Sequence, residues 1–266
     1  MASEADALRA ALVDHLCANR WIVSHAVEAA FRAVPRHAFL PGLPLEDVYA
    51  DRSIAIKLED GVPISSSSQP AIMAVMLELL RVQPGQRVLE IGTGSGYNAA
   101  LLALLVGPRG RVITIDLDPD LVAAARARLA AAGFGAVRAR SGDGARGAPD
   151  EAPFDALIAT VAVGGVPAAW YAQLREGGRL VMPLALGPSQ KVVAFERARG
   201  ALVSSAIVEA SFVSLRGPLA AHPSQALGEP AALAAWNDEQ RANAQRLRVE
   251  ALPAGGEQLA LSLRLR

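Results

Sequence analysis

The chain has 266 residues, of which 52% are hydrophobic, and a formal net charge of zero at pH 7; this allows a large core and excludes proteins that bind nucleic acid or anionic membranes mainly through charge. A single cysteine excludes an intrachain disulfide, and no Cys or His cluster has the spacing of a metal site. The acidic amino terminus and the lack of a long, uncharged apolar stretch predict a cytoplasmic protein without a membrane span.

The amino-terminal part is predicted to combine short helices with irregular segments. Apolar residues recur at helical spacing over residues 5–34, which predicts two short helices. Prolines then interrupt regular structure, so residues 48–56 are expected to form a loop or a short edge strand. A run from Ile64 through four serines to Pro70 precedes a strongly apolar helix predicted over residues 71–80.

The middle of the chain alternates predicted strands and helices, as a parallel sheet with crossover helices requires. The predicted strands are residues 87–91, 111–115, 136–140, 155–159 and 179–184. The predicted helices are residues 97–106, 120–132 and 167–174. Two further strands, 192–196 and 202–208, are separated by a short turn and should pair as an antiparallel hairpin at the edge of an α/β sheet.

The carboxy-terminal part changes character after residue 210. Several prolines indicate a linker, residues 231–249 are predicted to be a helix, and residues 258–266 alternate like a strand. The pattern divides the chain into three parts. These are a helical and loop segment over 1–69 that completes the substrate site, a Rossmann-like domain over 70–210, and an extension over 211–266.

The glycine-rich loop at residues 90–96 reads Glu-Ile-Gly-Thr-Gly-Ser-Gly between a predicted strand and helix. Without Cβ atoms, Gly92, Gly94 and Gly96 allow a sharp turn and the close approach of a nucleotide cofactor. The pattern also fits a dinucleotide fingerprint, so an NAD-dependent oxidoreductase and a non-catalytic cofactor-binding scaffold remain alternatives. Glu90 favours S-adenosylmethionine, because a carboxylate attracts a cationic amine or sulfonium and repels a pyrophosphate.

Two more acidic residues follow predicted strands. Asp116 ends the strand after the glycine loop, where a carboxylate can accept hydrogen bonds from both ribose hydroxyls. Asp143, followed by Gly144, comes after the next strand and can accept from an adenine amino group. Helix capping or loop solvation would explain either aspartate alone, but both together with the glycine loop favour S-adenosylmethionine.

Several short segments form a recognisable set of motifs. They are residues 34–39 (VPRHAF), 49–52 (YADR), 68–70 (SQP), 88–97 (VLEIGTGSGY), 142–144 (GDG), 153–156 (PFDA) and 177–183 (GGRLVMP). Together they resemble the protein-L-isoaspartate O-methyltransferase family. The resemblance implies a class I methyltransferase fold: Rossmann-like, with a mostly parallel sheet, an antiparallel edge hairpin, amino-terminal helices and a carboxy-terminal extension. It also implies S-adenosyl-L-methionine as cofactor and S-adenosyl-L-homocysteine as product.

The resemblance places Ser68 near the substrate carboxylate, with Ser66 nearby. A serine hydroxyl can hold a carboxylate without protonating it, and Pro70 at the start of a helix leaves first-turn N–H groups able to face an anion. Either serine could instead cap the helix. Thr160, beyond the fourth predicted strand, is expected to line the methyl-transfer end of the site.

The expected substrate is a peptide or protein that carries an aspartyl or isoaspartyl residue. Two departures from the family pattern indicate which kind of substrate to expect. Residues 59–64 (EDGVPI) with the four serines, and the tail with residues 212–217 (FVSLRG), resemble a divergent branch that modifies ribosomally made peptides such as lanthipeptides. In that branch an aspartate of a leader-bearing or matured peptide is methylated, and its ester forms a succinimide (aspartimide). General repair of isoaspartyl residues in proteins is the alternative.

Overall fold

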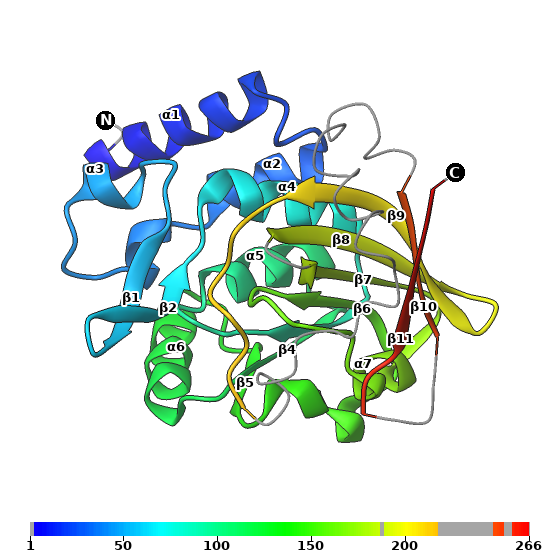
Figure 1. Cartoon of the computed structure of the whole chain (residues 1–266). Helices are drawn as coiled ribbons and strands as arrows, with labels where there is room; N and C mark the ends of the chain where they lie inside the picture. The colour runs from blue at the N-terminus through cyan, green and yellow to red at the C-terminus, as the bar shows by residue number, and fades with distance from the viewer. Residues whose placement is uncertain (1–2, 187–188, 218–246, 253–256, 266) are drawn as a thin grey trace. The chain divides into compact units, whose positions relative to one another are not determined.

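The computed structural model describes residues 3–186, 189–217, 247–252 and 257–265 (Figure 1). The chain divides into two compact units, Met1–Gly142 and Asp143–Arg266. None of the helices in the described ranges combines the length and apolar character needed to cross a membrane. The predicted division at residues 69 and 210 stays a prediction.

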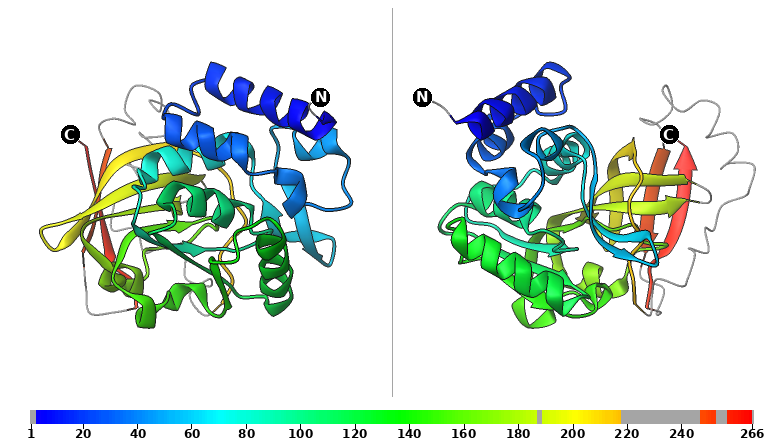
Figure 2. Two further views of the ribbon diagram at one scale, coloured as in Figure 1. Left: turned by 180° about the vertical axis from the view of Figure 1, so that it is seen from behind. Right: turned by 90° about the vertical axis from the view of Figure 1, so that its left-hand side faces the viewer.

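The first unit begins with the two short helices that the sequence predicted, α1 (Glu4–Ala18) and α2 (His25–Ala33). Short turns of helix follow at η1 (Arg36–Phe39) and α3 (Leu45–Val48). Phe31 of α2 packs edge-on against the ring of Tyr97, the first residue of α5, at 6.3 Å between centroids. Helix α2 therefore packs against α5, the helix that follows the glycine loop (Figure 2).

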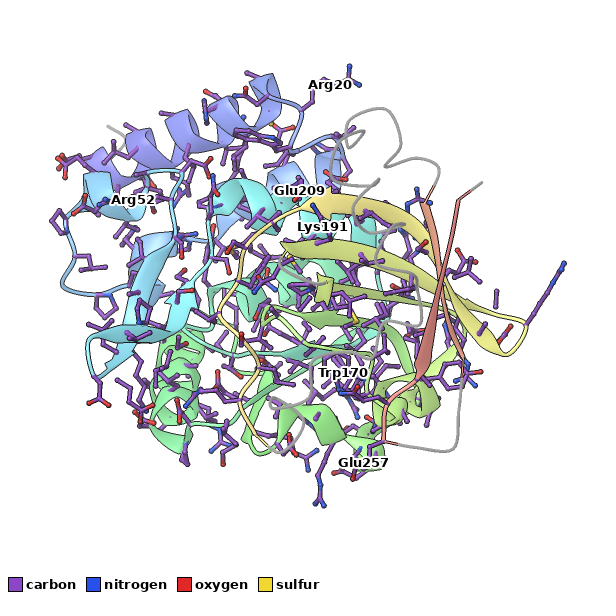
Figure 3. All side chains as sticks on the ribbon, viewed as in Figure 1. Arg20, Arg52, Trp170, Lys191, Glu209 and Glu257 are labelled. Atoms are coloured by element: carbon purple, nitrogen blue, oxygen red, sulfur yellow. The ribbon has the colours of Figure 1, made fainter. Side chains whose placement is uncertain are left out.

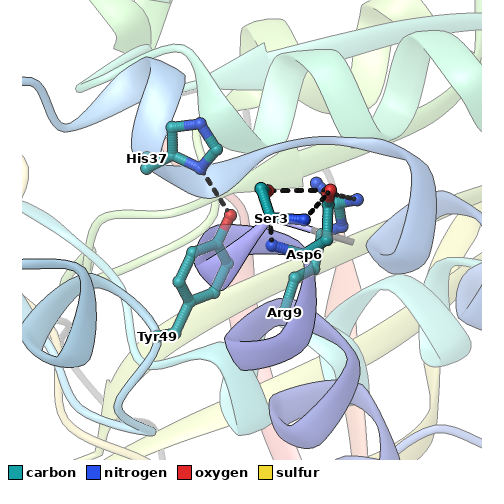
Figure 4. Close-up of polar contacts among 5 residues, drawn as sticks. All are labelled: Ser3, Asp6, Arg9, His37 and Tyr49. Atoms are coloured by element: carbon teal, nitrogen blue, oxygen red, sulfur yellow. Dashed lines mark hydrogen bonds and ion pairs between the residues drawn. The ribbon is translucent and has the colours of Figure 1, made fainter. Parts of the chain in front are cut away.

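Polar contacts fix the start of α1 and the η1 turn. Ser3 and Asp6 form a capping box, in which the Ser3 hydroxyl accepts from the Asp6 N–H and the Asp6 carboxylate accepts from the Ser3 N–H. Arg9 pairs with Asp6 at 2.6 Å. His37 Nδ1 lies 2.7 Å from the Tyr49 hydroxyl, which ties η1 to the end of α3 (Figure 4).

The serine run forms a strand, which the sequence did not predict. Strand β1 (Ile54–Glu59) pairs with β2 (Val62–Ser67) in an antiparallel hairpin, whose turn at Asp60 and Gly61 has φ values of 50° and 78°. Two consecutive positive φ angles match the twist of a hairpin. The loop or short edge strand expected over residues 48–56 thus becomes a strand only from Ile54. Helix α4 (Pro70–Leu80) follows as predicted.

The parallel sheet of the first unit carries the glycine loop at one edge. Strand β3 (Arg87–Ile91), strand β4 (Arg111–Asp116) and strand β5 (Arg138–Ser141) pair in parallel. Helix α5 (Tyr97–Val106) and helix α6 (Pro119–Ala131) are the crossovers between them. The carboxyl ends of parallel strands meet at one edge, which is where ligands bind in such sheets. Glu90 and Asp116 both lie at that edge.

The second unit pairs two parallel strands and then continues antiparallel. After short turns at η2 (Gly144–Arg146) and η3 (Pro149–Glu151), β6 (Phe154–Ala159) and β7 (Leu174–Leu186) pair in parallel, with α7 (Ala168–Gln173) between them. Strands β8 (Ser189–Ala198) and β9 (Ala201–Glu209) form the predicted antiparallel hairpin. On its β8 strand the ammonium of buried Lys191 contacts the Glu209 carboxylate of β9 (Figure 3).

Two predictions for the carboxy-terminal part are corrected. Strand β10 (Leu247–Leu252) pairs with β9 and with β11 (Ala260–Leu265), so the β8–β9 hairpin is not at the edge of the sheet. The helix predicted over 231–249 is wrong at residues 247–249, which belong to β10, and its remainder lies outside the described residues. Leu247 to Leu252 alternates apolar and charged residues at first, a period-two signal that favours a strand. Strand β11 confirms the strand expected near the carboxy terminus.

Candidate active site

The glycine loop is held in place by backbone bonds and by Asp116. The Gly92 N–H donates to the Ile115 carbonyl at 2.8 Å, and the Gly96 N–H donates to the Thr93 carbonyl at 2.9 Å. The Gly94 N–H donates to Asp116 Oδ2 at 2.9 Å. The structure therefore brings Asp116 directly to the loop, and the three predicted glycines have φ values of 98°, 50° and 89° in chain order.

Gly96 is constrained in two ways: it packs closely against helix α6, and its backbone is left-handed. A Cβ atom at Gly96 would lie 3.3 Å from the Cβ of Ala125 and 3.4 Å from Cγ of Leu129, in addition to the strain of φ +89°. We expect Gly96→Ala to reduce the free energy of unfolding by about 2 kcal/mol, because strain and overpacking add.

A matched control for Gly96 is Gly133, which is exposed, has φ +85° and has open space where a Cβ atom would lie, with nothing within 4 Å. Gly133→Ala carries the backbone strain alone, so it should cost about 1 kcal/mol. Urea unfolding of both variants compares the two losses. Equal losses of unfolding free energy in the two variants would show that close packing between the loop and α6 adds nothing to the cost of Gly96→Ala.

Glu90 is fully buried at the end of β3, beside Thr114 of β4 in the strand register. The Asn98 side-chain amide donates to Glu90 Oε1 at 2.7 Å, whereas Glu90 Oε2 has no hydrogen-bond partner in the described residues. Burial raises the pKa of Glu90 to about 7, although hydrogen bonds from Thr114 and Asn98 oppose the rise. A buried acceptor that lacks a partner fits the cationic amine of S-adenosylmethionine.

Sequence reasoning missed Asn98. It lies on the first turn of α5, eight positions after Glu90. The only signal available was a polar residue in an otherwise apolar helix. Its amide donates to one oxygen of the Glu90 carboxylate, and the other oxygen has no partner among the described residues.

Asp116 is half-buried at the end of β4 and is already engaged by the backbone. Its Oδ2 accepts from the Gly94 N–H, and its Oδ1 accepts from the Asp118 N–H at 3.3 Å. A carboxylate offers about four acceptor positions, so these two bonds leave capacity for ribose hydroxyls. Beyond it, Lys57 of β1 pairs with Asp118 at 3.3 Å and with Asp120 at 2.9 Å. These ion pairs hold the hairpin beside the start of α6 (Figure 1).

Strand β2 brings the serine run to the glycine loop. A Cβ atom at Gly94 would lie 3.6 Å from the Ser66 carbonyl oxygen and 3.8 Å from Ser65 Oγ. Side chains alternate along β2, so Ser65 and Ser67 are buried while Ser66 is half-buried. Ser68 comes directly after the strand and is also half-buried. Within the described part of the chain, neither the Ser66 nor the Ser68 hydroxyl makes a hydrogen bond. The structure thus places Ser66, predicted from the resemblance, next to the cofactor loop.

The start of α4 differs from the sequence-based expectation that a serine caps this helix or that its first-turn N–H groups face an anion. Pro70 is the first helical residue and Gln69 precedes it without a side-chain capping bond, so neither serine caps the helix. The Ala71 N–H donates to Asp51 Oδ1 at 2.8 Å, and the Gln69 amide donates to Asp51 Oδ2 at 2.9 Å. The expectation of first-turn N–H groups open to a ligand is wrong for Ala71, because a carboxylate of the chain itself occupies that place.

The remaining predicted site residues belong to the second unit. Asp143 caps η2 by accepting from the Ala145 N–H at 3.0 Å. The Gly144 carbonyl accepts from Trp170 Nε1 at 2.8 Å. Thr160 is half-buried in the loop after β6. The cofactor roles of these three residues stay predictions.

The tail stretch 212–217 packs on the same elements of the second unit. The Ala162 N–H donates to the Val213 carbonyl at 2.8 Å, and the Leu215 N–H donates to the Ala162 carbonyl at 2.7 Å. A Cβ atom at Gly217, where φ is +118°, would lie 3.4 Å from Asp143 Oδ1. The stretch therefore joins the loop after β6 to Asp143, a contact that the sequence did not predict.

Comparisons with known proteins agree with one another. A family described as protein-L-isoaspartate(D-aspartate) O-methyltransferase matches residues 7–219. A protein-L-isoaspartate O-methyltransferase of Thermotoga maritima is 36% identical over 204 residues, which are 76% of this chain and 64% of that protein. The protein of the same name from Gloeobacter violaceus is 38% identical over 205 residues, which are 77% of this chain and 96% of that protein.

Solved structures share the fold. One named protein-L-isoaspartate O-methyltransferase has a TM-score of 0.78 at 24% identity and covers 96% of this chain and 99% of its own. A Plasmodium falciparum protein, solved in complex with S-adenosyl-L-homocysteine, has a TM-score of 0.67 at 20% identity, over 77% of this chain and 97% of its own. The fold is therefore that of the class I methyltransferases, as the resemblance implied.

Proposed function

The chain belongs to the protein-L-isoaspartate O-methyltransferase family and is an S-adenosylmethionine-dependent methyltransferase; from that premise we propose that it methylates an aspartyl or isoaspartyl carboxylate of a peptide. One observation carries the proposal. The buried Glu90 Oε2 has no partner in the described residues, and it lies in the strand that leads into the glycine loop, against which β2 packs. A cation-binding acceptor and two serine hydroxyls that bond to none of the described residues thus belong to neighbouring elements of the first unit.

The proposed chemistry needs no general base. A side-chain carboxylate has an ordinary pKa near 4, so it is already an anionic nucleophile at pH 7. S-adenosylmethionine supplies the electrophilic methyl group, and its carbon–sulfur electron pair stays on the sulfur that leaves. A carboxylate oxygen forms the new bond to the methyl carbon, giving a methyl ester without proton transfer.

The residues of the chain act by binding and orientation. Glu90 would accept from the amine of the cofactor, and Asp116 would accept from its ribose hydroxyls. The Ser66 and Ser68 hydroxyls would donate to the substrate carboxylate and fix the oxygen that attacks. Correct placement of two reactants can supply most of the rate enhancement of such a reaction.

Within this activity we infer a dedicated peptide substrate, as in the branch that acts on ribosomally made peptides. The backbone nitrogen after the methylated residue would attack its ester carbonyl, and methanol would leave as the succinimide forms. The serine run of β2 is the supporting feature. The carboxy-terminal extension does not distinguish a dedicated peptide substrate from general repair, because a solved structure named protein-L-isoaspartate O-methyltransferase covers 96% of this chain. Repair of isoaspartyl residues is therefore the alternative that an experiment has to separate.

Three peptides that differ only at one position distinguish a dedicated substrate from general repair. That position holds an isoaspartyl residue in the first peptide, an aspartyl residue in the second and an asparagine in the third. Each is incubated with the protein and S-adenosylmethionine, and methyl ester is measured by mass spectrometry. Ester on the isoaspartyl peptide favours repair, and ester on the aspartyl peptide alone favours the dedicated role. Ester on neither peptide, or methylation of the asparagine peptide, would overturn the proposed carboxyl chemistry for such linear substrates.

The dinucleotide alternative makes a different prediction about stability. A ligand that binds only the folded protein raises the melting temperature, and the rise grows with its concentration relative to Kd. We expect S-adenosyl-L-homocysteine to raise the melting temperature and NAD to leave it unchanged, because a pyrophosphate near Glu90 would be repelled. A shift with NAD alone would restore the oxidoreductase reading.

A further inference from the structure

Arg36 is a fully buried cation in the first unit, within the motif at residues 34–39. Its Nη2 donates to the Ser68 carbonyl at 3.0 Å, and its Nη1 lies 3.7 Å from Met73 Sδ. Its Nε has no hydrogen-bond partner, and no carboxylate forms an ion pair with it, among the described residues. Burial of a guanidinium without an ion pair costs free energy, so the burial of Arg36 beside Ser68 needs an explanation.

Asp51 holds the next residues of the same segment. Its two carboxylate oxygens accept from the Gln69 amide and from the Ala71 N–H, at 2.9 Å and 2.8 Å. Burial lowers the pKa of Arg36, and the negative charge of Asp51 partly opposes that lowering because it favours the charged guanidinium. Arg36 therefore holds the backbone at Ser68, while Asp51 holds the backbone at Ala71 and the side chain of Gln69.

Arg36 also contacts the helix that the glycine loop opens. Its guanidinium carbon lies 5.3 Å from the ring centroid of Tyr97, a cation–π distance. Tyr97 directly follows Gly96 and is the first residue of α5. Phe39 supports the same ring at 5.8 Å between centroids. One side chain thus touches both the Ser68 backbone and the residue next to the cofactor loop.

We propose that Arg36 is a positioning residue, whose guanidinium fixes the Ser68 backbone relative to the glycine loop so that the Ser68 hydroxyl meets the substrate carboxylate in the reactive orientation. The inference rests on the proposed methyl transfer and assigns a role that acts through Ser68. A planar guanidinium can donate to a carbonyl and stack on a ring at once, whereas a lysine ammonium is a compact, strongly hydrated charge. Arg36→Lys should therefore not restore the role.

The test is a double-mutant cycle between Arg36→Met and Ser68→Ala, read as kcat/KM for the methyl-accepting peptide. Each single variant should lower kcat/KM about 30-fold, and the double variant should be no worse than Ser68→Ala alone, because Arg36 acts through Ser68. The affinity for S-adenosyl-L-homocysteine, measured by titration calorimetry, should stay within about twofold of the wild type, because the proposed role acts on the methyl-accepting peptide. The number of binding sites found in the same titration gives the concentration of folded protein. Rates are expressed per folded molecule, so that partial unfolding of a variant does not lower them.

Two further variants separate positioning from mere packing. Phe39→Leu removes a buried contact with Tyr97 but none with Ser68, so it should lower stability and leave kcat unchanged. Arg36→Lys keeps the charge and should fall as far as Arg36→Met. Multiplicative losses in the double variant, or rescue by lysine, would overturn the role of Arg36. A wild-type protein that methylates no peptide would instead contradict the proposed function.

Discussion

Glu90→Gln is expected to weaken binding of S-adenosylmethionine about 30-fold, or about 2 kcal/mol, because it replaces a buried charge pair by a neutral contact. Glutamine keeps the size of the side chain and an oxygen that can accept from Asn98. The matched control is Glu59→Gln on exposed β1, which should leave the affinity unchanged. Titration calorimetry measures both, and wild-type affinity in Glu90→Gln would contradict the assigned role.

The same residue predicts how cofactor affinity depends on pH. In the empty protein the pKa of Glu90 is about 7, because of burial. A bound ammonium group favours the carboxylate and lowers that pKa, so the empty protein holds more protons than the complex. Affinity should therefore rise between about pH 6 and about pH 7.5, by linkage. Glu90→Gln should lose this rise, and a rise equal to that of the wild type would assign the titration to another group.

The empty protein should show the opposite effect on stability. The folded pKa of Glu90, about 7, lies above the ordinary value of 4.5 for an exposed carboxyl. Its contribution to stability is thus full below about pH 4.5 and is lost as the pH rises through about 7. Glu90→Gln should consequently unfold at higher urea concentration than the wild type at pH 8. Binding the cofactor and keeping the empty fold stable place opposite demands on this residue.

Ser68→Ala is expected to lower kcat/KM for the methyl acceptor about 10- to 100-fold, because a hydrogen bond to a charged group contributes about 1.5–3 kcal/mol. Its hydroxyl makes no bond within the described residues, so its loss should leave the stability of the protein nearly unchanged. Ser67→Ala is the control, since Ser67 is the last residue of β2 and is buried, whereas Ser68 follows the strand and is half-buried. Steady-state rates at varied peptide concentration give the result.

Equal losses in Ser67→Ala and Ser68→Ala would contradict a specific role for the Ser68 hydroxyl. Cofactor affinity should be the same in both variants, because neither side chain is assigned to the cofactor. A loss of cofactor affinity in Ser68→Ala would move this residue to the donor side of the site.

The glycine loop and its strands could be predicted because the signals are local. A β-branched strand, three glycines and an apolar helix follow one another within about twenty residues, and the structure confirms each element. Parallel pairing then brings the end of β4 to the loop, so Asp116 was predictable from topology. The family resemblance supplied Ser66 and Ser68, which spacing alone would not have selected.

The contacts that complete the site come from distant residues, and local patterns do not carry them. Serine has little preference for strands, and β2 forms because it pairs with β1 across a tight turn. Asp51 reaches the start of α4 from 20 positions away, so no capping rule based on neighbours finds it. Strand β10 pairs with β9 and β11, in agreement with the local period-two pattern that the helix predicted over residues 231–249 overlooked.

Methyl transfer from isotopically labelled S-adenosylmethionine to an aspartyl or isoaspartyl peptide tests the central claim most directly. We expect label with the wild-type protein in a base-labile ester on the peptide, or in the methanol that is released when the ester forms a succinimide. Ser68→Ala and Glu90→Gln should both reduce this label strongly. Base lability identifies a carboxyl ester and distinguishes it from methylated nitrogen. Label that resists base, or no label on any carboxylate peptide and none in methanol while the cofactor product still binds, would contradict a carboxyl methyltransferase.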